Sequence, residues 1–446
     1  MVLTWGCQMN EDDSRQMANL LEQMGYRQAS EESDADVILL NTCSVRAKPE
    51  QKVRSKLGEL RLIKLEKKNL IIGVCGCMAQ REGEALQKRM PYIDLVIGTA
   101  SIPEIPMLIE QAKQGRRRLT ALDLPEKGSN GASHTHRIIE SAGLKTFVPV
   151  MYGCNNFCAY CVVPYARGPE RSRLPDEIVS EVTDLVSKGC REVTLVGQNV
   201  NSYGCSAASR QQPAASNKRT DFAELLCLVN DVSGIQRIRF MTSHPKDLND
   251  RLIEAMAELP KVCEHLHLPL QSGDNDILHR MGRGYTVERY RTLTDRLRER
   301  VPGISLTSDI LVGFPGETEE QFQNTLKTIE AVRFDAAYTF AFNARPGTAA
   351  AQMEDQLDGP TKIRRLREVI SIQEKINLEK NQADIGREFE VLVDGRNEKD
   401  SSKMTGYTRT SKIINFPGEL ELAGRLLTVR AKTAHPCGFT GELVNI

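Results

Sequence analysis

Short apolar segments alternate with amphipathic helical segments along most of this chain, and this alternation constrains the fold more than any other feature. Near the beginning, residues 1–5, 36–40 and 70–74 are apolar and of strand length, and a helix-like stretch follows each of them. Residues 14–26, for example, place apolar side chains at helical spacing. Strands that alternate with helices form βαβ units with a parallel sheet, so we expect an α/β fold.

The alternation resumes near residue 146 and provides a second series of candidate strands. These are residues 146–152, 192–197, 237–243, 265–271, 304–313 and 336–342. Thr318 and Gln321 have the spacing of a capping box, which predicts the start of the last helix in this series. Successive β/α units of this kind predict a partial or complete parallel barrel.

Polar segments and a change of pattern divide the chain. Residues 123–137 read as a linker, in which His134 and His136 lack companions that would complete a metal site, and residues 206–220 read as a surface insertion. After a charged helix, short strands separated by turn residues predict a small all-β barrel or sandwich. We therefore expect four parts: an N-terminal parallel-sheet α/β domain (1–115), a linker (116–140), the barrel with a connecting helix (141–380) and the all-β domain (381–446).

Charge and cysteine content limit the classes of function. Lysine plus arginine equals aspartate plus glutamate at 59 each, which argues against a protein that coats nucleic acid nonspecifically but leaves room for a local basic groove. No apolar run approaches the roughly 20 residues of a membrane span, and no leader precedes the first apolar strand, so we expect a cytoplasmic location and no membrane partner. Thiols stay reduced there, so the 12 cysteines are better interpreted as metal ligands or catalytic residues than as disulfides.

Three cysteines follow the three N-terminal strands directly. Cys7, Cys43 and Cys77 each stand where an apolar run ends. Ligands of parallel sheets bind at the carboxyl ends of the strands, so these residues would converge on one edge. The alternative is three cysteines that are simply buried at strand ends.

A second group of cysteines lies in CNNFCAYC, residues 154–161, directly after the first barrel strand. A structural zinc site takes four ligands, and no second cysteine pair is evident. A disulfide needs an oxidising compartment and leaves one cysteine over. An iron–sulfur cluster with three thiolates leaves one iron open for a substrate, and barrel enzymes place their chemistry at this end of the strands. The position and spacing favour the open cluster.

This triplet, with Tyr160 before its last cysteine, resembles that of the radical S-adenosylmethionine enzymes. The resemblance implies that Cys154, Cys158 and Cys161 hold a [4Fe–4S] cluster whose open iron chelates S-adenosylmethionine through its amino and carboxylate groups. It also implies that an electron from the cluster cleaves the sulfonium and yields a 5′-deoxyadenosyl radical.

Further motifs resemble those of the methylthiotransferase family over nearly the full length. They are TWGCQMN, NTCSVR, GCMAQ, YGCNNFCAYCVVPYARGPERSR, LVGQNVNSYG, MTSHP, LPLQSG, SDILVGFPGETEEQF and ARPGTAAAQM. The resemblance implies that Cys7, Cys43 and Cys77 hold a second, auxiliary [4Fe–4S] cluster, and that the all-β domain is a TRAM domain that binds RNA. The chain departs from the family pattern at Cys75, which either substitutes for Cys77 or is buried as a small apolar residue.

The motifs GQNVNSYG and TSHP are similar to those of the branch that acts on N(6)-dimethylallyladenosine beside the anticodon of tRNA. This implies that one S-adenosylmethionine methylates a sulfur on the auxiliary cluster, and a second supplies the radical that couples the sulfur to carbon 2 of the ring. It also implies tRNA and a flavodoxin- or ferredoxin-like reductant as partners, and not DNA. Sister branches act on threonylcarbamoyl-adenosine in tRNA or on an aspartate of a ribosomal protein. A noncatalytic iron–sulfur RNA-binding regulator is the alternative from another class.

Polar residues at the carboxyl ends of the barrel strands are candidates for binding S-adenosylmethionine. They are Gln198, Ser243, Gln271 and Asp309, with Gln198 a candidate for the amino group. Tyr160 belongs with them because it lies within the cysteine triplet. Arg167, Arg173 and Arg345 lie in predicted loops on the same face, where they could meet the carboxylate of the cofactor or RNA phosphates. The alternatives are capping residues and solvated arginines.

Overall fold

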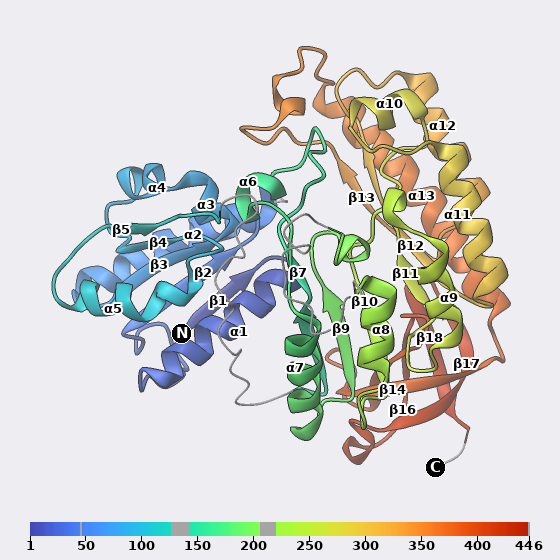
Figure 1. Ribbon diagram of the computed structural model, residues 1–446, viewed down its shortest axis with the longest axis horizontal. Coiled ribbons are helices and arrows are strands. Elements are labelled where there is room, and N and C mark those ends of the chain that lie inside the picture. The colour runs from blue at the N-terminus through green and yellow to red at the C-terminus, as the bar shows by residue number, and fades with distance from the viewer. Residues whose placement is uncertain (45–46, 126–142, 206–219, 445–446) are drawn as a thin grey trace.

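The computed structural model describes residues 1–44, 47–125, 143–205 and 220–444, which form three units along the chain (Figure 1). In that view the N-terminal sheet lies beside the central barrel, and the C-terminal strands lie below the barrel. His134, His136 and nearly all of the expected insertion at 206–220 lie outside the described residues.

Five parallel strands form the N-terminal sheet in the order β1-β2-β3-β4-β5. They are β1 (Val2–Trp5), β2 (Val37–Thr42), β3 (Ile71–Gly76), β4 (Leu95–Ile97) and β5 (Leu119–Ala121). The helices are α1 (Gln8–Gln23), α2 (Ala47–Glu66), α3 (Cys77–Glu82), α4 (Glu84–Arg89) and α5 (Ile105–Lys113). Met17 of α1 and Ile105 of α5 pack on one face of the sheet, and Leu57 of α2 and Leu86 of α4 on the other. Both faces are covered, as is usual for a parallel sheet.

Six parallel strands form the central unit, in two sheets with the orders β6-β9-β10 and β11-β12-β13. They are β6 (Lys145–Pro149), β9 (Glu192–Val196), β10 (Arg237–Phe240), β11 (His265–His267), β12 (Ser305–Val312) and β13 (Ala336–Ala341). A bridge between Ile238 and Val262 joins the two sheets. Among the described strands, β6 and β13 are edge strands that do not pair with each other. The barrel is therefore partial.

Helices cover the outside of this barrel. They are α7 (Pro175–Ser187), α8 (Phe222–Asn230), α9 (Asp250–Glu258), α10 (Asn275–Arg280), α11 (Val287–Arg300), α12 (Glu319–Val332) and α13 (Gly359–Ala383). Strand residues such as Leu195 and Ile310 share one buried apolar cluster with helix residues such as Val182. The predicted capping box at the start of α12 is confirmed: Thr318 accepts from the N–H of Gln321, whose side chain accepts from Thr318. No described helix is both long enough and apolar enough to cross a membrane.

Between the first barrel strand and α7 lie a short hairpin and a one-turn helix. Strand β7 (Met151–Tyr152) pairs antiparallel with β8 (Arg171–Ser172), and α6 (Val163–Arg167) lies in the segment between them. The cysteine triplet occupies the loop between β7 and α6. It is thus held at both ends by regular structure.

The last five strands close into a barrel in the order β14-β15-β16-β18-β17. They are β14 (Glu388–Arg396), β15 (Lys403–Thr408), β16 (Ile413–Pro417), β17 (Leu426–His435) and β18 (Gly438–Leu443). Buried Arg237 donates to the Glu390 carboxylate and to the Tyr407 carbonyl. Arg237 begins β10, so this small barrel packs at the amino ends of the central strands, opposite the cysteine triplet.

Candidate functional site

Cys7, Cys43 and Cys77 lie together at the carboxyl edge of the N-terminal sheet. Cys7 precedes α1, Cys43 follows β2, and Cys77 is the first residue of α3. The Cys43 side chain is hydrogen-bonded to both Cys7 and Cys77. Residues separated by more than 30 positions are thus brought together by the parallel topology, as their place at the strand ends predicts.

The surroundings of this group favour thiolates at two of its members. The hydrogen bond with Cys43 lowers the pKa of both Cys7 and Cys77, more than burial raises it, and the Arg167 guanidinium lowers both further. The pKa of Cys43 is raised because of its hydrogen bonds to both neighbours and because of burial. Since the thiolate is the form of cysteine that binds metal, the group is suited to a metal centre.

Two buried amides fix Cys7 relative to Cys43. Asn10 Oδ1 accepts from the backbone N–H of Cys7 at 3.3 Å, and Asn10 Nδ2 donates to Asn41 Oδ1 at 3.1 Å. Asn41 Nδ2 in turn donates to the Asn10 carbonyl at 2.8 Å and to Ser14 Oγ at 2.9 Å. Because Asn41 lies in β2 two residues before Cys43, these bonds hold the start of α1 against the end of that strand.

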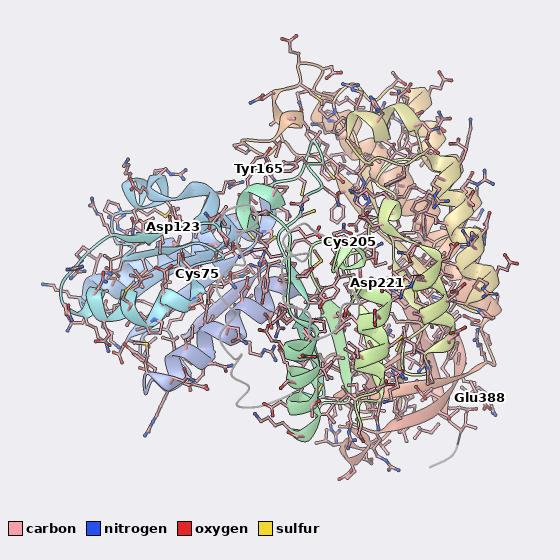
Figure 2. All side chains as sticks on the ribbon, in the orientation of Figure 1. Cys75, Asp123, Tyr165, Cys205, Asp221 and Glu388 are labelled. Atoms are coloured by element: carbon pink, nitrogen blue, oxygen red, sulfur yellow. The ribbon has the colours of Figure 1, made fainter. Side chains whose placement is uncertain are left out.

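Cys75 has a different environment from Cys77, although only Gly76 separates them. Its side chain is fully buried in the apolar cluster that includes Leu39 and Ile97, on the face covered by α1 and α5. Burial raises the pKa of this thiol well above its usual value. Figure 2 shows Cys75 within the N-terminal sheet. These surroundings are those of a small apolar residue, which is one of the two roles expected for Cys75.

Cys154, Cys158 and Cys161 lie in the loop after β7, and each sulfur receives an N–H. The backbone N–H of Asn156 donates to Cys154 Sγ at 3.3 Å, and that of Val163 to Cys161 Sγ at 3.4 Å. Arg283 Nη1 donates to Cys158 Sγ at 3.5 Å. Donors aimed at all three sulfurs stabilise negative charge on them.

The donor chemistry of both groups fits an iron–sulfur cluster. Burial raises the pKa of Cys154 to about 11 and that of Cys161 to about 12, so thiolates there need the positive charge of a bound metal. No group of three or more His, Cys, Asp or Glu side chains in the described part of the chain is arranged around a single ion. Each thiolate of a cubane cluster binds a different iron atom, so this finding about single ions does not bear on a cluster.

Unpartnered buried polar atoms lie at the carboxyl ends of β9 and β10. Among the described residues, Gln198 Oε1, Ser243 Oγ and His244 Nε2 have no hydrogen-bond partner. Thr242, beside Ser243, has a φ of +71°, a strained value for a β-branched residue. Buried polar atoms are almost always paired, so three in one place fit a polar ligand such as S-adenosylmethionine.

The other expected cofactor residues are spread around this end of the barrel. Asp309 Oδ1 lies 3.6 Å from His267 Nε2 inside the barrel. Tyr160 packs between the apolar cluster around Phe314 and the charge of Arg283. Gln271 has a φ of +71°, and its backbone pairs with Ile310. Their roles as cofactor ligands stay predictions.

The three arginines expected on this face are in other surroundings. Arg167 Nη2 donates to Asp13 Oδ2 at 2.7 Å, and Arg173 Nη1 donates to Glu181 Oε2 at 2.7 Å; both arginines are buried. Neither is available to an RNA phosphate. Arg345 lies with Nη1 3.7 Å from Glu50 Oε2, and its charge also acts near Cys43. Arg345 therefore lies near the N-terminal cysteines, although it follows the last barrel strand in the sequence.

Sequence reasoning missed several residues near the two cysteine groups. His244 accepts from the N–H of Lys246 through Nδ1, and burial lowers its pKa to about 2, so the ring is neutral. Glu170 accepts from Ser202 Oγ at 2.8 Å, and burial raises its pKa to about 7. His244 and Glu170 belong to the motifs TSHP and GPERSR, which were the signals available. Asp13 and Arg283 carry no local signal.

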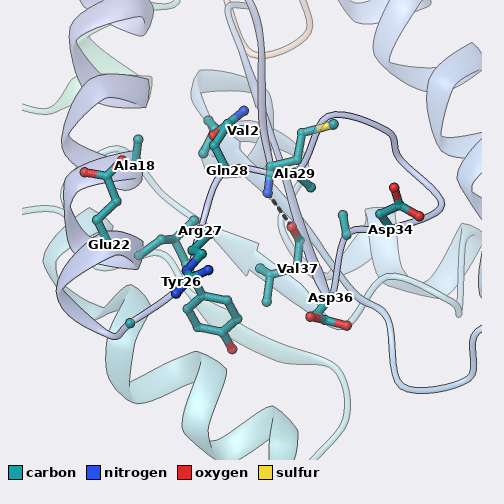
Figure 3. A pocket seen from close by; sticks show the side chains of 14 residues that line it. Val2, Ala18, Glu22, Tyr26, Arg27, Gln28, Ala29, Asp34, Asp36 and Val37 are labelled. Atoms are coloured by element: carbon teal, nitrogen blue, oxygen red, sulfur yellow. Dashed lines mark hydrogen bonds between the residues drawn. The ribbon is translucent and has the colours of Figure 1, made fainter.

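Two cavities lie apart from both cysteine groups, since no cysteine of either group lines them. One, of about 530 Å³, lies inside the partial barrel and is lined by inward residues such as Thr194, Arg239 and Thr307, by Tyr407 of the C-terminal barrel and by Gln8. The other, of about 220 Å³, lies near the start of β1 and is lined by Tyr26, Asp36 and neighbours (Figure 3). Because the second cavity is at the amino edge of the sheet, it is remote from Cys7, Cys43 and Cys77.

Three family profiles match successive parts of the chain. "Uncharacterized protein family UPF0004" matches residues 1–98, the radical SAM superfamily matches 148–329, and the TRAM domain matches 382–444. The radical SAM match runs from the end of β6 into α12, so it covers most of the partial barrel but not β13, and it includes the triplet Cys154, Cys158 and Cys161. The protein is therefore a radical S-adenosylmethionine enzyme with a C-terminal TRAM domain.

Curated relatives of similar length narrow the family. The tRNA-2-methylthio-N(6)-dimethylallyladenosine synthase of Desulforamulus reducens is 46% identical over 446 residues, covering 100% of this chain and 95% of the relative. The enzyme of the same name from Moorella thermoacetica is 45% identical, covering 100% of this chain and 98% of the relative. This chain belongs to the family of tRNA-2-methylthio-N(6)-dimethylallyladenosine synthases.

Solved structures agree in fold. The radical S-adenosylmethionine methyltransferase TsrM from Kitasatospora setae, with cobalamin and a [4Fe–4S] cluster bound, has a TM-score of 0.59 at 15% identity, covering 78% of this chain and 76% of TsrM. The cobalamin-dependent radical enzyme OxsB has a TM-score of 0.52 at 12% identity, covering 84% of this chain and 56% of OxsB. At these identities the likeness concerns the fold alone.

Proposed function

We propose that this protein attaches a methylthio group to carbon 2 of N(6)-dimethylallyladenosine next to the anticodon of tRNA, using S-adenosylmethionine and two [4Fe–4S] clusters. Relatives that carry this name over the full length support the substrate. The presence of two separate three-cysteine groups is the observation that supports the assignment of two clusters. The one-turn helix α6 lies between them, beginning two residues after Cys161 and packing against α3, which starts at Cys77.

The residues that would hold the cofactors follow from the site. Cys154, Cys158 and Cys161 would hold the radical cluster, and Cys7, Cys43 and Cys77 would hold the auxiliary cluster. When bound, the clusters and S-adenosylmethionine supply radical chemistry, which the non-acidic C–H bond at carbon 2 of adenine requires.

The protein itself binds and orients the reactants. Gln198, Ser243 and His244 offer buried polar atoms to the polar groups of S-adenosylmethionine. His244 Nδ1 is occupied as an acceptor, so Nε2 carries the proton and can donate to a carboxylate or ribose oxygen. The helices around the partial barrel shield its interior from water, except at the open edge between β6 and β13.

The TRAM domain and the compartment complete the proposal. The TRAM domain would contribute affinity for tRNA, as the presence of this domain and the names of the relatives suggest. A flavodoxin- or ferredoxin-like protein in the cytoplasm would supply the electrons.

Iron content and cluster removal test the assignment. Anaerobically reconstituted protein should bind about eight iron atoms in two cubane clusters. Replacing Cys154, Cys158 and Cys161 by alanine should remove one cluster and abolish cleavage of S-adenosylmethionine. Replacing Cys7, Cys43 and Cys77 should remove the other cluster, retain that cleavage and abolish the thiomethylated product. Bound zinc in place of iron would contradict the assignment.

Nucleoside mass spectrometry tests the substrate. tRNA from cells that lack the gene should contain N(6)-dimethylallyladenosine without the 2-methylthio group, and restoring the gene should restore the modification. If the methylthio group is instead lost only from threonylcarbamoyl-adenosine, or only from the aspartate of a ribosomal protein, the chain belongs to one of those branches.

A further inference from the structure

Each cysteine group has its own buried arginine, Arg167 beside the N-terminal cysteines and Arg283 beside the triplet. Arg167 and Arg283 are 5% and 6% exposed, respectively. Burying a guanidinium is costly unless negative groups compensate it. The negative groups that lie near each arginine therefore indicate its role.

Arg167 is supplied to the N-terminal cysteines by the barrel domain. It ends α6, which packs against α3, and Thr99 Oγ1 of the N-terminal domain donates to the Ala166 carbonyl at 2.7 Å. Its carboxylate partner Asp13 lies in α1, the helix that follows Cys7. The Arg167 charge acts on both Cys7 and Cys77. Figure 2 places Tyr165, two residues earlier, at the boundary between the two domains.

Arg283 serves the other group from within the barrel. Besides its bond to Cys158 Sγ, its Nη2 donates to the Pro269 carbonyl at 3.2 Å and its Nε donates to Tyr285 Oη at 3.1 Å. These bonds fix the plane of the guanidinium. No carboxylate among the described residues forms an ion pair with Arg283, so the negative charge that best compensates it is that of the cysteine group.

We propose that Arg167 and Arg283 are positioning residues that separately raise the reduction potentials of the auxiliary and the radical cluster, Arg167 doing so from the neighbouring domain. The inference rests on the proposed assignment of the two clusters. A cation near a cluster stabilises the reduced form, which carries one more negative charge, and the effect is large where water is excluded. The auxiliary potential then depends on the docking of the two domains.

Asp13 makes the sign of the effect testable. Asp13 pairs with Arg167 and carries the opposite charge. Removing the Asp13 charge should therefore raise the reduction potential of the auxiliary cluster, whereas removing the Arg167 charge should lower it. Burial raises the pKa of Asp13 to about 6, so at pH 8 the carboxylate is ionised. A shift caused only by loosening of the domain boundary would have the same sign in variants of either partner.

Potentiometric titration followed by electron paramagnetic resonance is the test, with the reconstituted full-length enzyme at pH 8. The two signals are assigned with the triple alanine variants. Arg167→Gln should lower the auxiliary potential and leave the radical potential unchanged, and Asp13→Asn should raise the auxiliary potential. Arg283→Gln should lower the radical potential alone. Arg173→Gln is the control: it removes a buried arginine that pairs with Glu181 rather than with either cysteine group, and it should shift neither potential.

The outcomes separate this inference from the proposed function. An unchanged auxiliary potential in Arg167→Gln, or a shift of the same sign in Asp13→Asn, overturns the role of Arg167. If Arg167→Gln loses the auxiliary cluster, the sign of the shift in the auxiliary potential of Asp13→Asn tests the role of Arg167. A wild-type protein with only one cluster contradicts the proposed function instead, and iron analysis detects this before any potential is measured.

Discussion

Two cysteines separated by one glycine show how the fold decides the role of a residue. Cys75 belongs to β3 and points into apolar packing, whereas Cys77 begins a helix beside Cys43. Sequence spacing leaves both as candidates, because a ligand at the end of a strand can be shifted by one or two positions. The strand-to-helix transition at Gly76 separates them.

Cys75→Ala should leave both clusters bound. It removes one buried sulfur, so we expect a loss of at most about 2 kcal/mol in stability and no loss of iron. Cys77→Ala should remove the auxiliary cluster and with it about half of the iron. Iron analysis and thermal denaturation under anaerobic conditions measure both effects. If Cys75→Ala loses the cluster and Cys77→Ala keeps it, the ligand is Cys75.

Among single residues, sequence reasoning recovers those with a local pattern and misses those that act over long separations. The triplet at 154–161 is local, and the N-terminal cysteines follow from strand ends. Arg167 meets Asp13 across 154 positions, and Arg283 meets Cys158 across 125. No periodicity or spacing encodes such pairs, so the sequence places Arg167 in a loop open to ligands, whereas the fold buries it in an ion pair.

At the scale of elements, the turn between β3 and α3 sets the position of Cys77. Gly76 has φ +86° and ψ −156°, a region that only glycine adopts readily. An added Cβ would lie 2.2 Å from Asn41 Oδ1, which belongs to the amide pair that fixes Cys7. The backbone at this turn and the amide pair therefore depend on each other.

Gly76→Ala should disrupt the auxiliary site. We expect a destabilisation of at least about 2 kcal/mol from the backbone and the clash together, and loss of the auxiliary cluster while the radical cluster stays. Gly25→Ala is the matched control, since Gly25 has φ +85° with open space around its Cβ position. Iron content distinguishes the two variants, and both should still cleave S-adenosylmethionine. Retention of both clusters in Gly76→Ala would show that the turn tolerates a side chain.

The elements themselves were largely predictable, because hydrophobic periodicity reports burial along one segment. All six barrel strands coincide with predicted segments, for example β9 (Glu192–Val196) with residues 192–197. Whether the barrel closes was not predictable, since closure depends on whether β6 and β13 pair. In the C-terminal barrel, β15 (Lys403–Thr408) buries Met404, Gly406 and Thr408, and because only the first of these is a large apolar residue the segment lacks a clear strand pattern.

At the scale of the whole molecule, the TRAM barrel is joined to the central barrel by buried hydrogen bonds and partly buried ion pairs. Arg239 donates to the carbonyls of Thr408 and Arg409 at 2.7 and 2.8 Å, and the Arg409 guanidinium pairs with Glu264 at 2.8 Å. Lys412 Nζ lies 3.9 Å from Asp335 Oδ1 of the central unit and 2.9 Å from Asp384, which follows α13. By charge alone, Arg409 and Lys412 would be able to bind RNA phosphates. Their ion pairs at the domain boundary make them structural. Truncation before this domain would uncover Arg239 and remove two of its acceptors, the carbonyls of Thr408 and Arg409.

The cations available to tRNA should therefore lie elsewhere on this barrel. The hairpin between β14 and β15 carries Arg396, Lys399 and Lys403, all wholly or partly exposed. Arg396 and Lys403 make exposed ion pairs with Glu419 and Asp400, and such pairs are weak enough to exchange for phosphates.

Changing these three hairpin residues together to glutamine should weaken tRNA binding while both clusters stay bound. The slope of log Kd against log salt should fall by about one for each phosphate that the variant no longer binds, because fewer counterions are released. Arg430→Gln is the control, since Arg430 pairs with Glu388 at the other end of β14 and should leave the slope unchanged. Arg409→Gln should lower the melting temperature and also leave the slope unchanged. An unaltered slope in the triple variant would move tRNA recognition from this hairpin to the loops at the carboxyl end of the central barrel.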